Sequence, residues 1–253
     1  MALGMDSETY AKLRADIRAD LREEIMAEVR QQLIPMVRAL VQEVMDSVKS
    51  TVAATQFDQD IIGLCETWLS DKIPDSLLSL NSKYNVLRSD RSCSMKGGGV
   101  AILAKRHLSF EGTETLALNS GCELVSADFS CANAYHFRFI VAYRRPECSV
   151  QETREFFDCL TNWCCVVHTT IIVGDFNIPL SRTRSYNVDM LTDFLAECGL
   201  VSLIDESTRE NSLLDLLLSI DAALINNPRV TPNFGTSDHC SISLKLLGPL
   251  DQL

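Results

Sequence analysis

The sequence lacks the features that define several classes of protein. Its first residues carry acidic and basic side chains in place of an apolar stretch, so they do not indicate a secretory signal. It has no run of about eighteen apolar residues, so we do not expect a membrane-spanning helix. No Cys-x-x-Cys pair occurs among the ten cysteines, and only four histidines could act as further ligands. A structural zinc site is therefore not expected.

The cysteines are more typical of core residues than of a disulfide framework. Cys65, Cys159 and Cys198 stand within apolar segments, where a free thiol behaves as a small hydrophobic side chain. Reduced thiols are typical of reducing compartments. With no signal sequence and no membrane span, the prediction is a soluble intracellular protein of the nucleus or the cytoplasm.

Basic residues are outnumbered along the whole chain, which has a net charge of −11. Residues 56–253 contain 16 basic and 25 acidic residues, so this part alone has a charge of −9. Such a domain lacks the positive surface of a protein that binds nucleic acid tightly. A hydrolase that meets phosphate through a divalent cation is still compatible with this charge, and we expect weak binding of a DNA substrate.

Residues 6–50 have the pattern of an amphipathic helix. Apolar residues recur every four positions from Leu13 to Leu33, and Pro35 should kink or break the helix near its middle. Steps of four drift around a helix, which fits a regular heptad coiled coil poorly. We predict that residues 1–55 form a helical extension that packs on its own domain or on a partner helix. Self-association as a coiled coil is the alternative, and a membrane contact is not favoured because the polar face is mixed.

The remaining residues, 56–253, are predicted to form one domain of short strands and few helices. One helix should begin after Ser149, which forms a capping-box pattern with Glu152, and another should cover 188–198 and end at Gly199. Many strands with few helices predict an α/β sandwich of two sheets with helices outside. The predicted strands are 61–65, 84–88, 99–104, 122–129, 137–143, 170–174, 200–204, 214–219 and 241–246.

Polar residues stand next to several of these predicted strands. Loops at one edge of a rigid sheet often carry functional residues. The residues at these positions are Glu66, Tyr143, Arg144, Asp175, Asn177, Asp215, Asp238 and His239.

These residue types match the requirements of phosphodiester cleavage. A divalent cation held by carboxylates neutralises charge on the phosphate, and Glu66 is a candidate ligand. An imidazole oriented by a carboxylate can take a proton from water near neutral pH, and His239 with Asp215 offers this pair. Each residue also has a structural alternative, such as a solvated turn or a structural hydrogen bond. Candidate hydrogen-bond donors to the phosphate are Asn177, Tyr143 and Arg144.

The order of these elements resembles that of the endonuclease/exonuclease/phosphatase superfamily over residues 60–247. Within this superfamily, the sequence pattern is similar to that of the endonuclease domain of LINE-type non-LTR retrotransposons. The resemblance implies a four-layer α/β sandwich, with two mixed sheets flanked by helices. It also implies Mg²⁺ in the cleft, with Mn²⁺ as an alternative. The matching elements are Asp60-Ile61-Ile62-Gly63-Leu64-Cys65-Glu66-Thr67-Trp68-Leu69, Gly97-Gly98-Gly99-Val100-Ala101, Tyr143-Arg144-Arg145-Pro146, Gly174-Asp175-Phe176-Asn177, Asn211-Ser212-Leu213-Leu214-Asp215-Leu216 and Ser237-Asp238-His239.

The resemblance also implies roles for the metal and phosphate ligands. Glu66 would be the principal metal ligand, and Asp238 would contribute nearby. Asn177 and Tyr143 would bind the phosphate.

For the proton transfers, the resemblance implies a second group of residues. His239 would act as the general base or as a protonated partner of the phosphate, oriented by Asp215. Asp175 would position or activate the attacking water. Whether Asp175 or His239 receives the proton of the water is left open by the sequence.

One element of the family pattern is absent. The family begins with a strand that carries an active-site Asn, but no Asn precedes Asn81 in this chain. The missing strand would leave a gap in a sheet and remove one ligand. Two functions are therefore considered: a metal-dependent DNA endonuclease of retrotransposon type, and an inactive endonuclease-like domain that acts as an interaction module through its N-terminal helix.

Overall fold

The computed structural model describes residues 59–79, 82–91, 97–131, 135–166, 169–180, 185–233 and 237–247, with a few isolated positions between 23 and 32. The predicted helical extension of residues 1–55 and its self-association lie outside these described ranges and stay predictions. No helix within the described ranges is long and apolar enough to cross a membrane.

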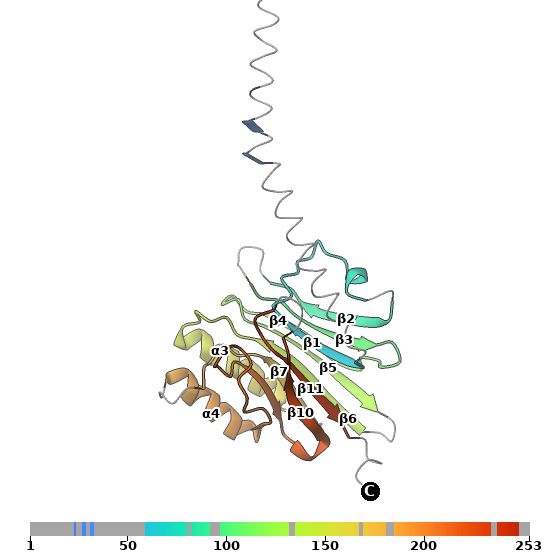
Figure 1. The fold of residues 1–253 in the computed structure, drawn as a ribbon, viewed down its shortest axis with the longest axis vertical. Coiled ribbons are helices and arrows are strands. Elements are labelled where there is room, and N and C mark those ends of the chain that lie inside the picture. Colours follow the sequence, from blue (N-terminus) through green and yellow to red (C-terminus); the bar gives the residue numbers. More distant parts are fainter. Residues whose placement is uncertain are drawn as a thin grey trace, which may run out of the picture. The chain divides into compact units, whose positions relative to one another are not determined.

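A six-stranded mixed sheet forms the centre of the domain (Figure 1). Neighbouring strands are antiparallel except β6 and β7, which are parallel and joined through α3 (Val150–Cys164). Helix α4 (Tyr186–Cys198) follows β7 in the chain. In spatial order the strands are β4 (Thr113–Ala117), β5 (Glu123–Cys131), β6 (Tyr135–Tyr143), β7 (Thr169–Asp175), β9 (Asp215–Ser219) and β8 (Val201–Ser202).

Two smaller antiparallel sheets form the second sheet layer. One has the order β1-β3-β2, and the other pairs β10 with β11. A short 3-10 turn at Asp75–Leu77 lies between β1 and β2, and another at Ala222–Leu224 lies between β9 of the six-stranded sheet and β10. The strands are β1 (Ile61–Cys65), β2 (Tyr84–Ser89), β3 (Val100–Lys105), β10 (Ile225–Thr231) and β11 (Ser241–Leu246).

Alternation of side chains along the central strands explains the layers. On β6, Ile140 and Ala142 pack against α3 and α4, whereas Phe139 and Val141 pack against the smaller sheets. Both sets are buried, so each central strand is apolar on both faces, as expected for a sheet covered on both sides. The predicted α/β sandwich is confirmed. Its second sheet is divided in two within the described ranges.

Both predicted helices are present, and their ends follow local side-chain chemistry. The Ser149 side chain accepts a hydrogen bond from the backbone of Glu152, whose carboxylate accepts from the backbone of Ser149, and this capping box begins α3. Helix α4 begins at Tyr186, slightly before the predicted start, because Ser185 caps it. It ends at Gly199, which has a φ of 65°.

Two strands were not predicted from the sequence, β4 and β10. Strand β4 is an edge strand with mostly exposed polar side chains, so it carries little hydrophobic signal. Strand β10 contains Pro228 and an irregularity between Asn226 and Arg229, and both features obscure a strand pattern. Of the predicted segment 200–204, only Val201–Ser202 forms a strand.

The cysteines of the described ranges are free thiols, as expected from their apolar surroundings. Cys122 and Cys164 are buried, and Cys65 donates a hydrogen bond to the backbone oxygen of Ala142 at 3.5 Å. The buried thiols of Cys122 and Cys164 therefore act as packing groups in the core.

Candidate functional site

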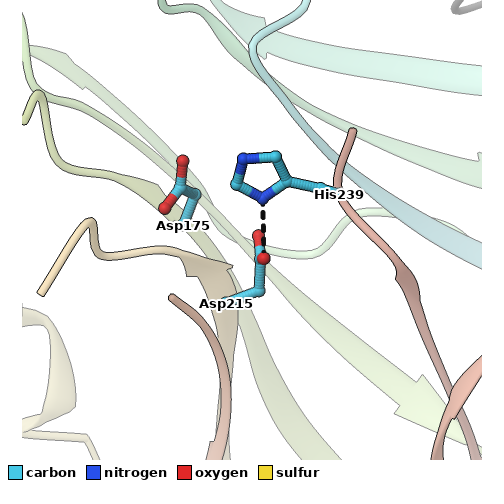
Figure 2. A group of neighbouring side chains, drawn as sticks. All are labelled: Asp175, Asp215 and His239. Atoms are coloured by element: carbon cyan, nitrogen blue, oxygen red, sulfur yellow. Dashed lines mark hydrogen bonds and ion pairs between the residues drawn. The ribbon is translucent and has the colours of Figure 1, made fainter. Parts of the chain in front are cut away.

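Three of the predicted site residues converge at one edge of the sandwich (Figure 2). Asp175 ends β7 and Asp215 begins β9, and the antiparallel register places these two residues directly opposite each other. His239 precedes β11, and its Nδ1 lies 2.7 Å from Oδ2 of Asp215. One ligand atom from each of the three residues lies within 4.8 Å of the others. The structure therefore brings together residues that are far apart in the sequence.

The electrostatics of this cluster place protonation changes near neutral pH. Asp175 is only 3% exposed, and burial together with the charge of Asp215 raises its pKa to about 7. The hydrogen bond to Asp215 raises the pKa of His239. Because both groups titrate above their ordinary ranges, the cluster can hold and release protons around neutrality.

A residue that the sequence did not indicate, Thr208, holds this geometry. Its Oγ1 accepts hydrogen bonds from the backbone N–H groups of Leu214 and Asp215, at 3.1 and 3.0 Å. Its backbone oxygen accepts a hydrogen bond from the N–H of Cys240 at 2.7 Å. Thr208 is fully buried and so ties the start of β9 to the segment that carries His239. A lone Thr in a polar loop gives no sequence signal for this role.

Thr208→Val should lower the free energy of unfolding by about 1 to 3 kcal/mol, because two backbone donors lose their acceptor in a buried position. Thr208→Ser keeps the oxygen and should retain most of the stability. Urea unfolding followed by circular dichroism measures both variants. Equal losses for Val and Ser would show that the methyl group, and not the oxygen, stabilises this region.

Glu66 and Tyr143 form a second pair of predicted site residues. The hydroxyl of Tyr143 donates a hydrogen bond to Oε1 of Glu66 at 2.9 Å. Burial and the negative charge of Glu66 raise the pKa of Tyr143, so its hydroxyl stays a donor at neutral pH. Glu66 is exposed and has a φ of 52°, at the point where the chain leaves β1. Its second carboxylate oxygen is therefore available to a ligand.

A pocket of about 600 Å³ connects the two groups. At the end of the pocket next to these groups, the lining carboxylates are Glu66, Asp175, Asp215 and Asp238, and Asp60 lines the pocket at the start of β1. Oxygen atoms are the ligands that Mg²⁺ and similar hard cations prefer. Of these residues, Asp175 and Asp215, together with His239, have ligand atoms close enough to one another to hold a cation.

Asp238 occupies the exposed border of this pocket. Its side chain is 67% exposed and forms an ion pair with Arg209. Arg209 is a basic residue next to the site that the sequence did not indicate.

The structure does not support a phosphate-binding role for Arg144. Its guanidinium is fully buried behind the site, where it donates to Oγ1 of Thr153 at 2.8 Å. Its other contacts are backbone oxygens, including those of Phe176 and Asn177 at 3.4 Å. The prediction was wrong for a physical reason: the side chain extends to the helix side of the sheet and donates hydrogen bonds to the loop after β7.

Asn177 has its amide N–H groups committed within the same loop. They donate to Oδ2 of Asp175 at 2.8 Å and to the backbone oxygen of Arg144 at 2.9 Å. A φ of 47° turns the chain so that the Asn177 N–H also reaches Oδ1 of Asp175 at 3.0 Å. In this arrangement, Asn177 orients Asp175, and the predicted contact of Asn177 with phosphate stays a prediction.

Glu123 is a buried carboxyl group beside the site that the sequence did not indicate. It is 1% exposed and pairs with Tyr143 in the β5–β6 register. Burial raises its pKa to about 8, and a hydrogen bond from the backbone of Gly99 partly offsets this rise. Gly98 permits the close approach, because a Cβ atom there would lie 2.9 Å from Oε1 of Glu123. The glycine segment Gly97–Gly99 therefore covers a protonated acid.

Glu123→Gln should stabilise the protein increasingly as the pH rises from about 5 to 8. The folded state keeps Glu123 protonated until its pKa of about 8, whereas the unfolded chain ionises near 4.5. The wild type therefore loses about 1 kcal/mol of unfolding free energy per pH unit in this window, a loss that Gln avoids. Urea unfolding with EDTA at several pH values, with exposed Glu155→Gln as control, measures the effect. A difference that stays constant with pH would contradict it.

Comparisons with known proteins give one match to a family model and several matches in fold. Residues 137–243 match the model of a family described as endonuclease-reverse transcriptase. This match covers less than half of the chain. Among curated proteins, none matches the chain.

Several solved structures share the fold. An endonuclease/exonuclease/phosphatase family protein from Leptotrichia buccalis superposes with a TM-score of 0.60 and 19% identity, covering 82% of this chain and 94% of its own. The endonuclease domain of TRAS1, a telomere-specific non-LTR retrotransposon, gives a TM-score of 0.58 at 15% identity, with coverages of 80% and 93%. The human nocturnin catalytic domain gives 0.58 at 16%, with coverages of 78% and 86%. At these identities, the likeness establishes the fold alone.

Proposed function

We propose that the chain is a divalent-metal-dependent phosphodiesterase that nicks DNA, an endonuclease of the retrotransposon type. The observation that carries this proposal is the 2.7 Å hydrogen bond between Asp215 and His239, with Asp175 beside it in the same pocket. An oriented imidazole next to carboxylate oxygens is an arrangement suited to activating water against a phosphodiester. The match to the endonuclease-reverse transcriptase model supports DNA as the substrate.

His239 is proposed to accept the proton of the attacking water. Its Nδ1 is held by Asp215, and its second ring nitrogen is turned away from that carboxylate (Figure 2). Asp215 stabilises the imidazolium that forms. Asp175, whose pKa lies near neutrality, is positioned by Asn177 to orient the water.

Glu66 and Asp238 are proposed to hold Mg²⁺, with Mn²⁺ as the alternative. A divalent cation at these oxygens supplies neutralisation of phosphate charge. Tyr143 keeps the carboxylate of Glu66 in place through its hydrogen bond. On substrate binding, the same hydroxyl is proposed to turn from Glu66 and donate to a phosphate oxygen instead. The excess of acidic residues makes us expect weak DNA binding that depends on the cation.

Conversion of supercoiled plasmid to the nicked form in the presence of Mg²⁺ tests the proposal. The wild type should nick, EDTA should stop the reaction, and His239→Ala should reduce the rate by about 10²-fold or more. Lys72→Ala, a change at an exposed lysine outside the pocket, is the control and should nick at the wild-type rate. If the wild type and His239→Ala nick equally little and no metal binding is measured, the proposal is wrong.

A non-catalytic interaction module is the second candidate. The observation that favours it is the division of the second sheet into two parts, which leaves strand edges without partners among the described strands. The same plasmid assay separates the two candidates, because only an enzyme loses activity on replacement of His239.

A further inference from the structure

Two strand edges face each other across the pocket beside the candidate site. Strand β1 is hydrogen-bonded to β3 on one side, and β11 to β10 on one side. Among the described strands, none is hydrogen-bonded to the opposite edge of either β1 or β11. Residues of both strands line the same pocket. Figure 1 shows the two strands in the same layer.

The outward backbone groups of β1 follow from its register. Lys105 donates to the oxygen of Asp60, so Asp60 and the alternate residues after it face β3. The N–H and C=O groups of Ile61, Gly63 and Cys65 therefore point to the unpaired edge. Gly63, in the middle of β1, is exposed, which agrees with an open edge.

The same reasoning applies to β11. Leu247 donates to the oxygen of Leu224, so alternate residues from Leu247 backwards face β10. The N–H and C=O groups of Ile242, Leu244 and Leu246 therefore point into the pocket. Within the described strands, these groups have no ladder partner, and all three residues are only partly buried.

The floor of the pocket between these edges is apolar. It is formed by alternate residues of β6 and β7, which belong to the core between the sheets. A side chain that enters the pocket from above would bury apolar surface against them. The floor residues are Phe137, Phe139, Val141, Ile171 and Val173.

These features are specific for an extended polypeptide. Only a β-strand offers backbone donors and acceptors on both edges together with side chains that alternate between two faces. The edges are about five residues long, or about 17 Å, at the usual rise of a strand. Strand β1 runs toward the site and β11 away from it, so a strand laid between them is parallel to one neighbour and antiparallel to the other.

The charge at one end of the pocket indicates which charge the bound strand should carry at that end. The site end is lined by Glu66, Asp175, Asp215 and Asp238, with His239. A strand that ends there with a basic side chain would meet carboxylates, whereas an acidic end would be repelled.

We propose that the pocket between β1 and β11 is an acceptor for an extended peptide strand of another molecule, with alternating apolar residues and a basic end, which joins the two small sheets into one. The strand forms backbone hydrogen bonds with both edges, and its apolar side chains cover Phe139, Val141 and Val173. This interaction surface does not depend on the nuclease proposal, because it requires only the two edges and the floor.

Amide hydrogen exchange of the full chain provides the first test. In the free protein, the outward amides of Ile61, Gly63, Leu244 and Leu246 should exchange much faster than those of Ile62 and Leu64, which face β3. If the outward amides are already as slow as the paired ones, a segment of the chain itself closes the gap, and the proposal is overturned.

Peptide binding provides the second test. The probe is the fluorescein-labelled peptide Lys-Ile-Thr-Val-Thr-Ile-Lys, blocked at both ends, which fits the pocket in either direction. Two control peptides have the same sequence, and each carries N-methyl groups on one of the two alternating sets of backbone nitrogens. Each control peptide therefore cannot donate hydrogen bonds along one of its two edges. Fluorescence anisotropy should show saturable binding of the probe and at least about tenfold weaker binding of the N-methylated forms.

The two measurements together decide the proposal. Bound probe should slow exchange at the outward amides of β1 and β11 and leave Ile62 and Leu64 unchanged. No saturable binding, equal binding of the N-methylated peptides, or protection elsewhere in the protein would overturn it. None of these readouts uses DNA or a metal, so the result is separate from the outcome of the plasmid assay.

Discussion

Asp215→Asn should reduce the Mg²⁺-dependent nicking rate by about 10²- to 10⁴-fold while leaving the fold intact. The amide is close in size to the carboxylate, but it carries no charge to stabilise the imidazolium of His239. It also can hold the ring in the wrong tautomer, because the amide nitrogen donates where the carboxylate oxygen accepts. The initial rate of plasmid nicking at saturating Mg²⁺ is the measurement.

The pH dependence distinguishes loss of this base from a general loss of structure. The base form of His239 is the active one, so the wild-type rate should rise with pH through the raised pKa of His239. Removal of the Asp215 charge lowers this pKa, and the residual activity of Asp215→Asn should therefore rise at lower pH than that of the wild type. Exposed Asp205→Asn, which makes the same chemical change, should leave rate and profile unchanged. A wild-type rate or an unshifted profile in Asp215→Asn would contradict the assigned role.

The same pair contributes to stability in a defined pH range. The pKa of His239 is higher in the folded state than its ordinary value, because the Asp215 carboxylate accepts a hydrogen bond from the protonated ring. This contribution is complete below the unfolded pKa of His239 and is lost as the pH rises through the folded pKa. Above the folded pKa of His239, we therefore expect greater activity together with lower stability.

The sequence predicted the parts of the site that follow directly from strand ends. Asp175, Asp215 and His239 each stand next to an apolar segment, and such positions meet at one sheet edge once the strands assemble. Arg144 shows the limit of this reasoning. Adjacent residues along an extended chain point to opposite faces, and nothing in the sequence shows that Tyr143 faces Glu66 while Arg144 faces the helices.

Thr208 and Glu123 could not be predicted because their roles depend on distant contacts. Thr208 is defined by two backbone donors that reach it only after β9 has formed. Glu123 begins a strand and would ordinarily be assigned to the surface, yet the glycine segment around Gly98 covers it. Both are determined by tertiary packing, which no local pattern records.

For the fold, segments with strong local signals were predicted closely, and segments stabilised by their neighbours were not. Strand β1 has the predicted bounds because five apolar or small residues separate clear polar flanks. Strands β4 and β10 are polar edge strands that exist because β5 and β11 supply hydrogen bonds. The missing first strand was inferred from the family pattern alone, and it stays a prediction because the segment before residue 59 lies almost entirely outside the described ranges.

Gly174→Ala should be among the most destabilising single substitutions, with a loss of more than about 4 kcal/mol in unfolding free energy. A Cβ atom at Gly174 would lie 1.9 Å from the backbone oxygen of Ala142 in the parallel strand β6. The φ of 153° is also a backbone conformation that residues other than glycine rarely adopt. Relief of the clash requires separation of β6 and β7 at the centre of the main sheet.

Gly199→Ala is the matched control, because it adds the same methyl group where nothing lies within 4 Å. Its only penalty is the left-handed φ of 65°, so a loss of about 1 kcal/mol is expected. Urea unfolding of both variants, followed by far-ultraviolet circular dichroism, gives the comparison. Equal losses would mean that β6 and β7 accommodate a methyl group between them at little cost. A much larger loss for Gly174→Ala would show that the close approach of β7 to β6 depends on the absence of a side chain at Gly174. The same approach sets the position of Asp175, because the N–H of Arg144 donates to the backbone oxygen of Asp175 at 2.9 Å.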